Sequence, residues 1–217
     1  MPLICEDFVF DWAYNKISNS LDIQQFGNIR VTSTSYYLIS FLDFIQSPRQ
    51  TKHLFSSRFV DFRKAFDLVD HSCHQQSPRL AGFLTGRQQA VRYQNYISSF
   101  QQLTHGVPKG TKMSPLCFLI LINDAITNTT HHWKYINDCT VGLPIDNKNP
   151  EYSALQAKLE QLQQWTEESK MTINHTKTVV MHVYTLVAVP LPSSPWALIP
   201  SKWFGRPSYL GSQWMTS

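Results

Sequence analysis

Two acidic residues, Asp61 and Asp138, stand in apolar surroundings at distant points of the chain. The first lies in the string Phe-Val-Asp-Phe, and the second closes the string Tyr-Ile-Asn-Asp. A carboxylate inside an apolar strand costs free energy unless a partner neutralises it, and carboxylate oxygens are ligands that suit Mg²⁺. A bound cation is therefore one explanation for an acid in such surroundings.

Each acid also has an ordinary structural explanation. Asp61 precedes Lys64–Val69, whose apolar spacing is typical of the start of a helix, with Ala65 and Phe66 on its apolar face. The carboxylate would then cap that helix. Asn137-Asp138 is typical of a hairpin turn. Neither string decides by itself between a structural and a chemical role.

A third string predicts a geometry suited to phosphate. Residues 106–116 read Gly-Val-Pro-Lys-Gly-Thr-Lys-Met-Ser-Pro-Leu. Ser114 and Pro115 are typical of an N-cap and a first helical position. Leu116–Ile122 is apolar on nearly every side, which predicts a deeply buried helix. Backbone N–H groups at such a helix start bind a phosphate or a sugar, although a plain loop-to-helix junction fits the same residues.

In this order the three strings resemble motifs A, B and C of reverse transcriptases, and most nearly those of non-LTR (LINE-type) retrotransposons. The string Phe-Val-Asp-Phe-Arg-Lys-Ala-Phe-Asp, the Gly-Val-Pro-x-Gly loop and the Lys-Tyr-x-x-Asp turn are specific together and weak singly. The resemblance implies an α+β fold, with a palm-like antiparallel sheet, packed helices, a partial helical fingers segment and no thumb. It divides the chain into fingers (1–57), palm (58–185) and a non-matching tail (186–217) that we expect to be disordered.

The resemblance also implies a reaction. Members of the family add deoxynucleoside triphosphates to the 3′-hydroxyl of a DNA primer on an RNA template, using two Mg²⁺ ions. By position, Asp61 and Asp138 would lie opposite each other on adjacent strands of one sheet and would hold the metal. Lys177, within the motif D string Met171–Met181, would donate a proton to the leaving pyrophosphate, although a solvated loop lysine is the simpler alternative.

The residues that the resemblance assigns to nucleotide or template binding are Gln25, Arg30, Phe62, Phe66, Lys109 and Gly110. Phe66 matches an aromatic gate against the 2′-hydroxyl. Gly110 lets the backbone approach the nucleotide and template. Gln25 and Arg30 belong to the fingers, where Arg30 would touch a phosphate, and a solvated loop arginine is an equal alternative for it.

Two positions depart from the family pattern. Asn137 stands where the family has the first aspartate of motif C. Its neutral oxygen removes a contribution worth several kcal/mol, or roughly a thousandfold in rate at about 1.36 kcal/mol per tenfold. Lys109 replaces a glutamine, which adds a charge and removes an acceptor. We therefore expect an impaired or inactive enzyme.

Two alternatives stay open. One is a catalytically inactive remnant that still binds nucleic acid, and the other is a decayed reading frame whose product does not fold stably. The remnant would bind nucleic acid through Arg58, Arg63, Lys64, Lys109 and Lys112.

The remaining sequence predicts the elements that position these residues. Apolar spacing predicts helices over 6–21 and 32–46. The residues expected to face inward are Phe8, Val9, Trp12, Ile17, Leu21, Leu38, Ile39, Leu42 and Ile45. Further expected elements are a polar loop at 47–57, a strand at 58–62, a strand pair at 90–96 and 99–104, a hairpin at 134–142 and a helix starting at 149.

Composition sets only wide bounds on function. The chain has 217 residues with 42% apolar content, enough for a core in about one domain. A net charge of +4 permits a nucleic-acid partner without requiring one. Four separated cysteines suit a reducing compartment, and no signal peptide or long apolar run is visible. We expect an intracellular protein, nuclear or cytoplasmic, without a membrane partner.

Overall fold

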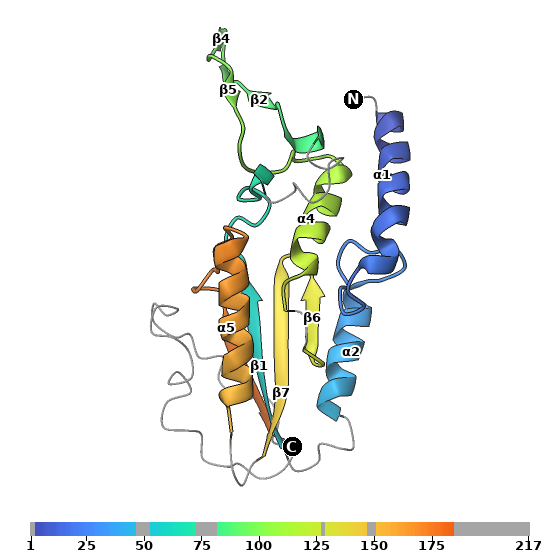
Figure 1. The fold of residues 1–217 in the computed structure, drawn as a ribbon, viewed down its shortest axis with the longest axis vertical. Helices are drawn as coiled ribbons and strands as arrows, with labels where there is room; N and C mark the ends of the chain where they lie inside the picture. The colour runs from blue at the N-terminus through green and yellow to red at the C-terminus, as the bar shows by residue number, and fades with distance from the viewer. Residues whose placement is uncertain (1–2, 47–52, 73–81, 127–128, 147–150, 185–217) are drawn as a thin grey trace.

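The computed structural model of the chain describes residues 3–46, 53–72, 82–126, 129–146 and 151–184. Its centre is a four-stranded antiparallel sheet with the strand order β6-β7-β1-β8 (Figure 1). The strands are β1 (His53–Asp61), β6 (His132–Tyr135), β7 (Asp138–Asp146) and β8 (Val179–Tyr184). The helices are α1 (Leu3–Ile17), the 3-10 helix η1 (Ser18–Ser20), α2 (Thr34–Gln46), α4 (Met113–Asn123) and α5 (Ser153–Glu168).

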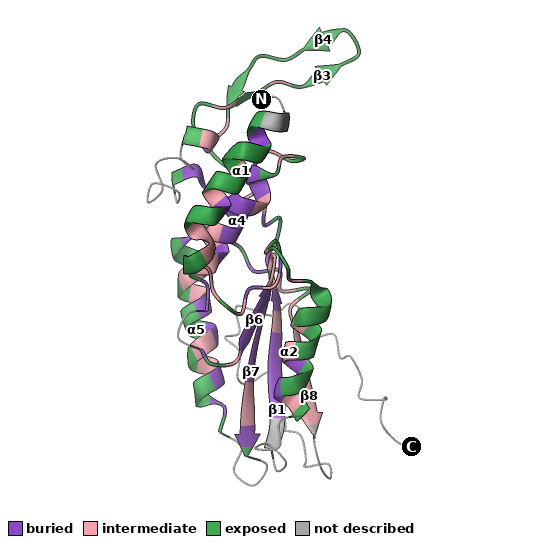
Figure 2. Ribbon diagram, turned by 90° about the vertical axis from the view of Figure 1, so that its right-hand side faces the viewer, coloured by how far each residue is buried: buried purple, intermediate pink, exposed green. Residues whose placement is uncertain are grey.

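Helices cover both faces of this sheet. Side chains alternate between the faces of a strand, so each face collects its own apolar cluster. On one face, Phe41 and Phe44 of α2 pack on Phe55 and Trp133. On the other face, α4 and α5 enclose the larger cluster, which includes Val60 of β1. Figure 2 shows the sheet between α5 and α2. The result is the α+β, palm-like architecture that the sequence predicts.

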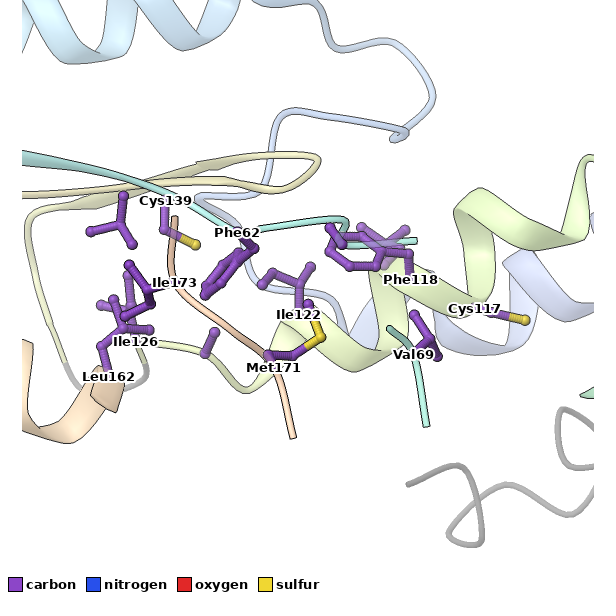
Figure 3. Packing of buried hydrophobic residues seen from close by; sticks show 14 of the residues in the cluster. Phe62, Val69, Cys117, Phe118, Ile122, Ile126, Cys139, Leu162, Met171 and Ile173 are labelled. Atoms are coloured by element: carbon purple, nitrogen blue, oxygen red, sulfur yellow. The ribbon is translucent and has the colours of Figure 1, made fainter. Parts of the chain in front are cut away.

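Helix α4 runs through the larger core and is apolar on nearly all sides, as predicted. Phe118 and Ile122 are fully buried. Figure 3 shows Ile122 beside Phe62 and Met171, which come from segments far apart in the sequence. The loop before α4 is hydrogen-bonded to the turns after β1, through Gly106 N–H to the Val69 carbonyl and Val107 N–H to the Phe66 carbonyl.

The segment before α2 lies along the edge strand β6. The backbone N–H of Phe26 donates to the carbonyl of Lys134, and the N–H of Lys134 donates to the carbonyl of Gln24, both at 2.8 Å. The predicted fingers segment is therefore hydrogen-bonded directly to the palm sheet. Strand β1 also begins at His53, upstream of the boundary expected after residue 57.

Three local predictions were wrong. Strand β1 takes in part of the expected polar loop, and Phe55 is fully buried. Residues 64–67 form turns and not a helix, because Lys64 has a φ of 47°, a left-handed conformation that an α-helix excludes. Ala65 is nevertheless buried, as its apolar position predicts. Helix α4 begins at Met113, so Ser114 lies inside the helix and is not its N-cap.

The predicted inward faces of the two N-terminal helices were also largely wrong. In α1, Phe8 and Trp12 are exposed and Tyr14 is buried. In α2, Ile39 is exposed and Phe41 is buried. Of the residues expected to face inward, Ile17, Leu21 and Ile45 do pack against the core clusters.

A narrow β-arm leaves the body between β1 and α4 (Figure 1). It consists of two short antiparallel ladders, β2 (Gln88–Gln89) with β5 (Gln101–Gln102) and β3 (Arg92–Tyr93) with β4 (Tyr96–Ile97). An antiparallel pair is present as predicted, but its expected bounds were wrong. The turn lies at 94–95, inside the strand expected over 90–96, and Tyr96 belongs to the returning strand. The expectation of disorder for 186–217 lies outside the described residues. Within those residues, no helix combines the length and apolar character that a bilayer crossing requires.

Candidate active site

Asp61 and Asp138 are register partners at one end of the sheet. Asp61 is the last residue of β1, Asp138 is the first residue of β7, and the antiparallel ladder places them directly opposite each other. Opposed residues of such a ladder have Cα atoms about 4.5–5.5 Å apart. The predicted meeting of the two acidic strings on adjacent strands is confirmed.

A tight hairpin turn presents the second string. Tyr135 pairs with Asp138, which leaves Ile136 and Asn137 as the two turn residues. Ile136 has a φ of 56°, which is strained for a β-branched side chain. Gly27 supports this turn from behind, since a Cβ on Gly27 would lie 2.3 Å from the backbone nitrogen of Ile136. Only glycine permits this close approach.

The side-chain amides of two asparagines donate hydrogen bonds to the carboxylate of Asp61. Asn137 Nδ2 donates to Asp61 Oδ1 at 3.1 Å, and Asn174 Nδ2 donates to Asp61 Oδ2 at 2.7 Å. The backbone N–H of Asn174 also donates to the Asp61 carbonyl at 2.7 Å. The hydroxyl of Thr176 donates to Asn174 Oδ1 at 2.8 Å, which keeps the amide NH₂ turned toward the acid. Asn174 is therefore the residue that fixes Asp61.

The charges at this end of the sheet are incompletely balanced. Partial burial and the neighbouring negative charge of Asp61 raise the pKa of Asp138, and the positive charge of Lys177 partly offsets that rise. A pocket of about 360 Å³ opens beside these groups. Its lining comprises Thr34, Tyr37, Phe59, Val60, Asp61, Tyr135, Asp138, Lys177 and Val179. The structure thus brings Lys177 to the same pocket as the two predicted metal ligands.

This donor set fits an oxygen-liganded cation. Two opposed carboxylates with a raised pKa on one of them are the arrangement that a divalent ion relieves. Asp61 and Asp138 would hold such an ion, with the amide oxygen of Asn137 as a neutral neighbour. Within the described part of the chain, no group of three or more acidic, histidine or cysteine side chains forms a metal cluster. The site is therefore compatible with Mg²⁺ but poor in negative charge.

Three of the predicted nucleotide-binding residues line a second pocket. Phe66, Lys109 and Gly110 lie around a space of about 510 Å³ between the turns after β1 and the loop before α4. Lys109 forms an ion pair with Asp67 at 2.9 Å. Gly110 has a φ of 79°, and no atom lies within 4 Å of the position that a Cβ would take, so its backbone is open to an approaching group.

The other three predicted residues lie elsewhere. Phe62 is 2% exposed and packs on Trp165 in the core, so its side chain cannot touch a nucleotide. Gln25 is also 2% exposed, on the edge of the sheet. Arg30 forms an ion pair with Asp11 and lies over the rings of α1.

The basic residues predicted to hold nucleic acid divide in the same way. Arg58 is 1% exposed, and burial lowers its pKa to about 10, so it cannot contact a ligand at the surface. Lys112 forms an ion pair with Asp7 at 2.5 Å. Arg63 and Lys64 are exposed.

Two residues of the site were missed from the sequence. Asn174 stands three residues before Lys177 in the motif D string, but we predicted no role for it. Tyr37 lines the first pocket, and its hydroxyl hydrogen-bonds with that of Thr140 at 2.7 Å. No sequence signal distinguishes Tyr37 from its aromatic neighbours.

A family model described as reverse transcriptase (RNA-dependent DNA polymerase) matches residues 10–213. This chain belongs to the reverse transcriptase family. The matched range takes in most of the segment 186–217 that we expected to fall outside the resemblance.

A curated relative and a solved structure are also similar to this chain. A probable RNA-directed DNA polymerase from the X-element transposon of Drosophila melanogaster is 31% identical over 110 residues. The match covers 46% of this chain and 12% of that protein, so the chain spans only a small part of its relative's length. Among solved structures, telomerase of Candida tropicalis, in complex with a fragment of telomeric RNA, superposes with a TM-score of 0.59 at 10% identity. It covers 84% of this chain and 34% of the telomerase chain, and it supports the fold alone.

Proposed function

We propose that this chain is the reverse transcriptase domain of a non-LTR retrotransposon, with an RNA-directed DNA polymerase activity that Asn137 makes weak. The observation that carries the proposal is the register pairing of Asp61 with Asp138. Two opposed carboxylates can hold the metal ions that template-directed nucleotidyl transfer uses. The partners would be an RNA template, a DNA primer and deoxynucleoside triphosphates.

Each residue then has a separate task. Asp61 and Asp138 would hold the metal, and two Mg²⁺ ions, when bound, would stabilise charge on the attacking and leaving oxygens. Lys177 would donate a proton to the leaving pyrophosphate. Phe66 would exclude a 2′-hydroxyl, and Gly110 would let the backbone approach the nucleotide.

A second candidate function is nucleic-acid binding without catalysis. One observation favours it: both oxygens of Asp61 already accept hydrogen bonds from the amides of Asn137 and Asn174. A metal must displace or share these donors. At position 137 the neutral side chain also offers less attraction to the cation than a carboxylate.

Primer extension on an RNA template with Mg²⁺ separates the two candidates. We expect the Asn137→Asp variant to extend the primer roughly a thousandfold faster than the unmodified chain, from several kcal/mol of lost metal stabilisation. Equal rates would contradict the role given to Asn137. If both variants are folded by circular dichroism, bind an RNA–DNA hybrid and never extend it, the second function is the correct one.

A further inference from the structure

The β-arm, residues 87–103, carries bulky side chains that are mostly exposed. Tyr93 and Tyr96 are register partners next to the turn, so their rings share one face of the ribbon. Their exposed fractions are 71% and 79%. Phe100 is equally exposed lower on the arm. Figure 2 shows β3 and β4 exposed along their whole length.

The arm also carries positive charge without negative charge. No acidic residue occurs anywhere between Asp70 and Asp124, whereas Arg87 and Arg92 lie on the arm itself. Arg92 pairs in register with Ile97, on the face opposite the two tyrosines. An exposed ribbon with aromatic rings, arginines and no carboxylates complements a nucleic acid, which has negatively charged phosphates and planar bases.

The loop that follows the arm is hydrogen-bonded to the turns after β1. The N–H of Gly106 donates to the carbonyl of Val69 at 2.8 Å, and the N–H of Val107 donates to that of Phe66 at 2.9 Å. Asp70 holds this region through an ion pair with Lys170 and a longer one with His105 at 3.6 Å. The arm therefore leads directly into the loop that carries Lys109 and Gly110, beside the second pocket.

We propose that the arm binds single-stranded RNA by stacking unpaired bases on Tyr93 and Tyr96, with Arg92 contacting a phosphate. This inference rests on the proposed function, since it places the template next to the nucleotide pocket. Rings on a ribbon two strands wide can stack with unpaired bases but not with bases inside a duplex. Arginine adds an attraction that weakens with salt.

Fluorescence anisotropy with a labelled single-stranded oligoribonucleotide of mixed sequence tests the inference without requiring catalysis. The double variant Tyr93→Ala/Tyr96→Ala should bind at least tenfold more weakly than the unmodified chain. The conservative variant Tyr93→Phe/Tyr96→Phe keeps the rings and should bind within about twofold. The matched control is Phe8→Ala/Tyr36→Ala, which removes two exposed rings from α1 and α2 and should leave affinity unchanged.

Each alternative outcome overturns the inference in a recognisable way. Equal affinity of the Tyr→Ala double variant and the unmodified chain would remove the arm from RNA binding while leaving the primer-extension result untouched. Equal binding of a duplex of the same sequence would exclude stacking on unpaired bases. If the Tyr→Ala pair abolishes self-association in sedimentation velocity and leaves RNA affinity intact, the arm binds a second copy of this chain instead.

Discussion

Single residues decide how charge is balanced at the end of the sheet. The carboxylate of Asp61 is held by the amides of Asn137 and Asn174, which donate hydrogen bonds without adding charge. An aspartate at position 137 would instead place a third carboxylate beside Asp61 and Asp138. Asn137 therefore stabilises the metal-free protein at this end of the sheet, whereas the family's aspartate would strengthen metal binding. Natural active sites often exchange stability for function in this direction.

Asn174→Ala tests the contact that fixes Asp61. The variant loses the Nδ2 donor to a charged, part-buried acceptor, so we expect it to lower the free energy of unfolding by about 1–2 kcal/mol. Asn174→Asp should cost more at pH 7, because two carboxylates then face each other. Urea denaturation followed by tryptophan fluorescence measures both. An Asn174→Ala variant as stable as the unmodified chain would show that this contact is dispensable.

Among the elements, the β6–β7 hairpin depends on a segment that lies more than a hundred residues earlier. Residues 24–26 hydrogen-bond along β6, and Gly27 packs against the backbone of the turn that carries Asn137. The resemblance placed this segment in the fingers near the nucleotide. In the structure it packs against the turn, so it affects the site by holding the turn in place and not by contacting a nucleotide.

Gly27→Ala should therefore destabilise the protein by about 1–3 kcal/mol, since its Cβ would lie 2.3 Å from Ile136 N and 2.6 Å from Ile136 Cγ1. Gly82→Ala is the matched control, because no atom lies within 4 Å of its Cβ position. Chemical denaturation should leave the control within about 0.5–1 kcal/mol of the unmodified chain. Equal stability of the two variants would contradict the close approach.

The order of elements and the meeting of the two acids could be predicted from sequence, because the motifs place each acid at the end of a strand and the resemblance makes those strands neighbours. The inward faces of α1 and α2 could not. Helix α2 carries aliphatic residues such as Ile39 on one side and aromatic residues such as Phe41 on another, so apolar spacing fits both orientations. The larger aromatic side chains bury more apolar area, and they pack on the sheet.

The turn after β1 and the role of Asn174 were unpredictable for another reason. Lys64 adopts a left-handed backbone conformation that its residue type does not signal. Asn174 acts through a hydrogen bond to a residue more than a hundred positions away. Such a contact depends on the folded sheet and has no local pattern in the sequence.

At the scale of the whole molecule, one buried ion-pair cluster joins the segment between α1 and α2 to strand β6 of the sheet. Lys134 is fully buried, and its Nζ lies 2.8 Å from Asp22 Oδ2. His132 contacts the same oxygen at 2.7 Å. Burial alone would raise the pKa of Asp22, but the hydrogen bonds from His132 and Lys134 hold it well below its usual range. Removing the acid leaves a buried lysine without its counter-charge.

Asp22→Asn should lower the free energy of unfolding by about 3–5 kcal/mol at pH 7. Because the folded pKa is depressed, this stability is present above the ordinary value of 3.8 and declines as the pH falls below it. The difference between variant and unmodified chain should thus narrow below pH 3.8. Asp11→Asn, which breaks an exposed pair, should cost less than about 1 kcal/mol. If the difference in free energy of unfolding between Asp22→Asn and the unmodified chain did not change with pH, the depressed pKa of Asp22 would not be its source.

The central claim is that Asp61 and Asp138 form one cation site, which Asn137 weakens. Mn²⁺ titration followed by electron paramagnetic resonance measures that site directly, with no need for catalysis. We predict that Asn137→Asp binds Mn²⁺ at least tenfold more tightly than the unmodified chain and that Asp61→Asn loses the site. Equal affinity for the unmodified chain and Asn137→Asp, or unchanged binding by Asp61→Asn, would contradict the account.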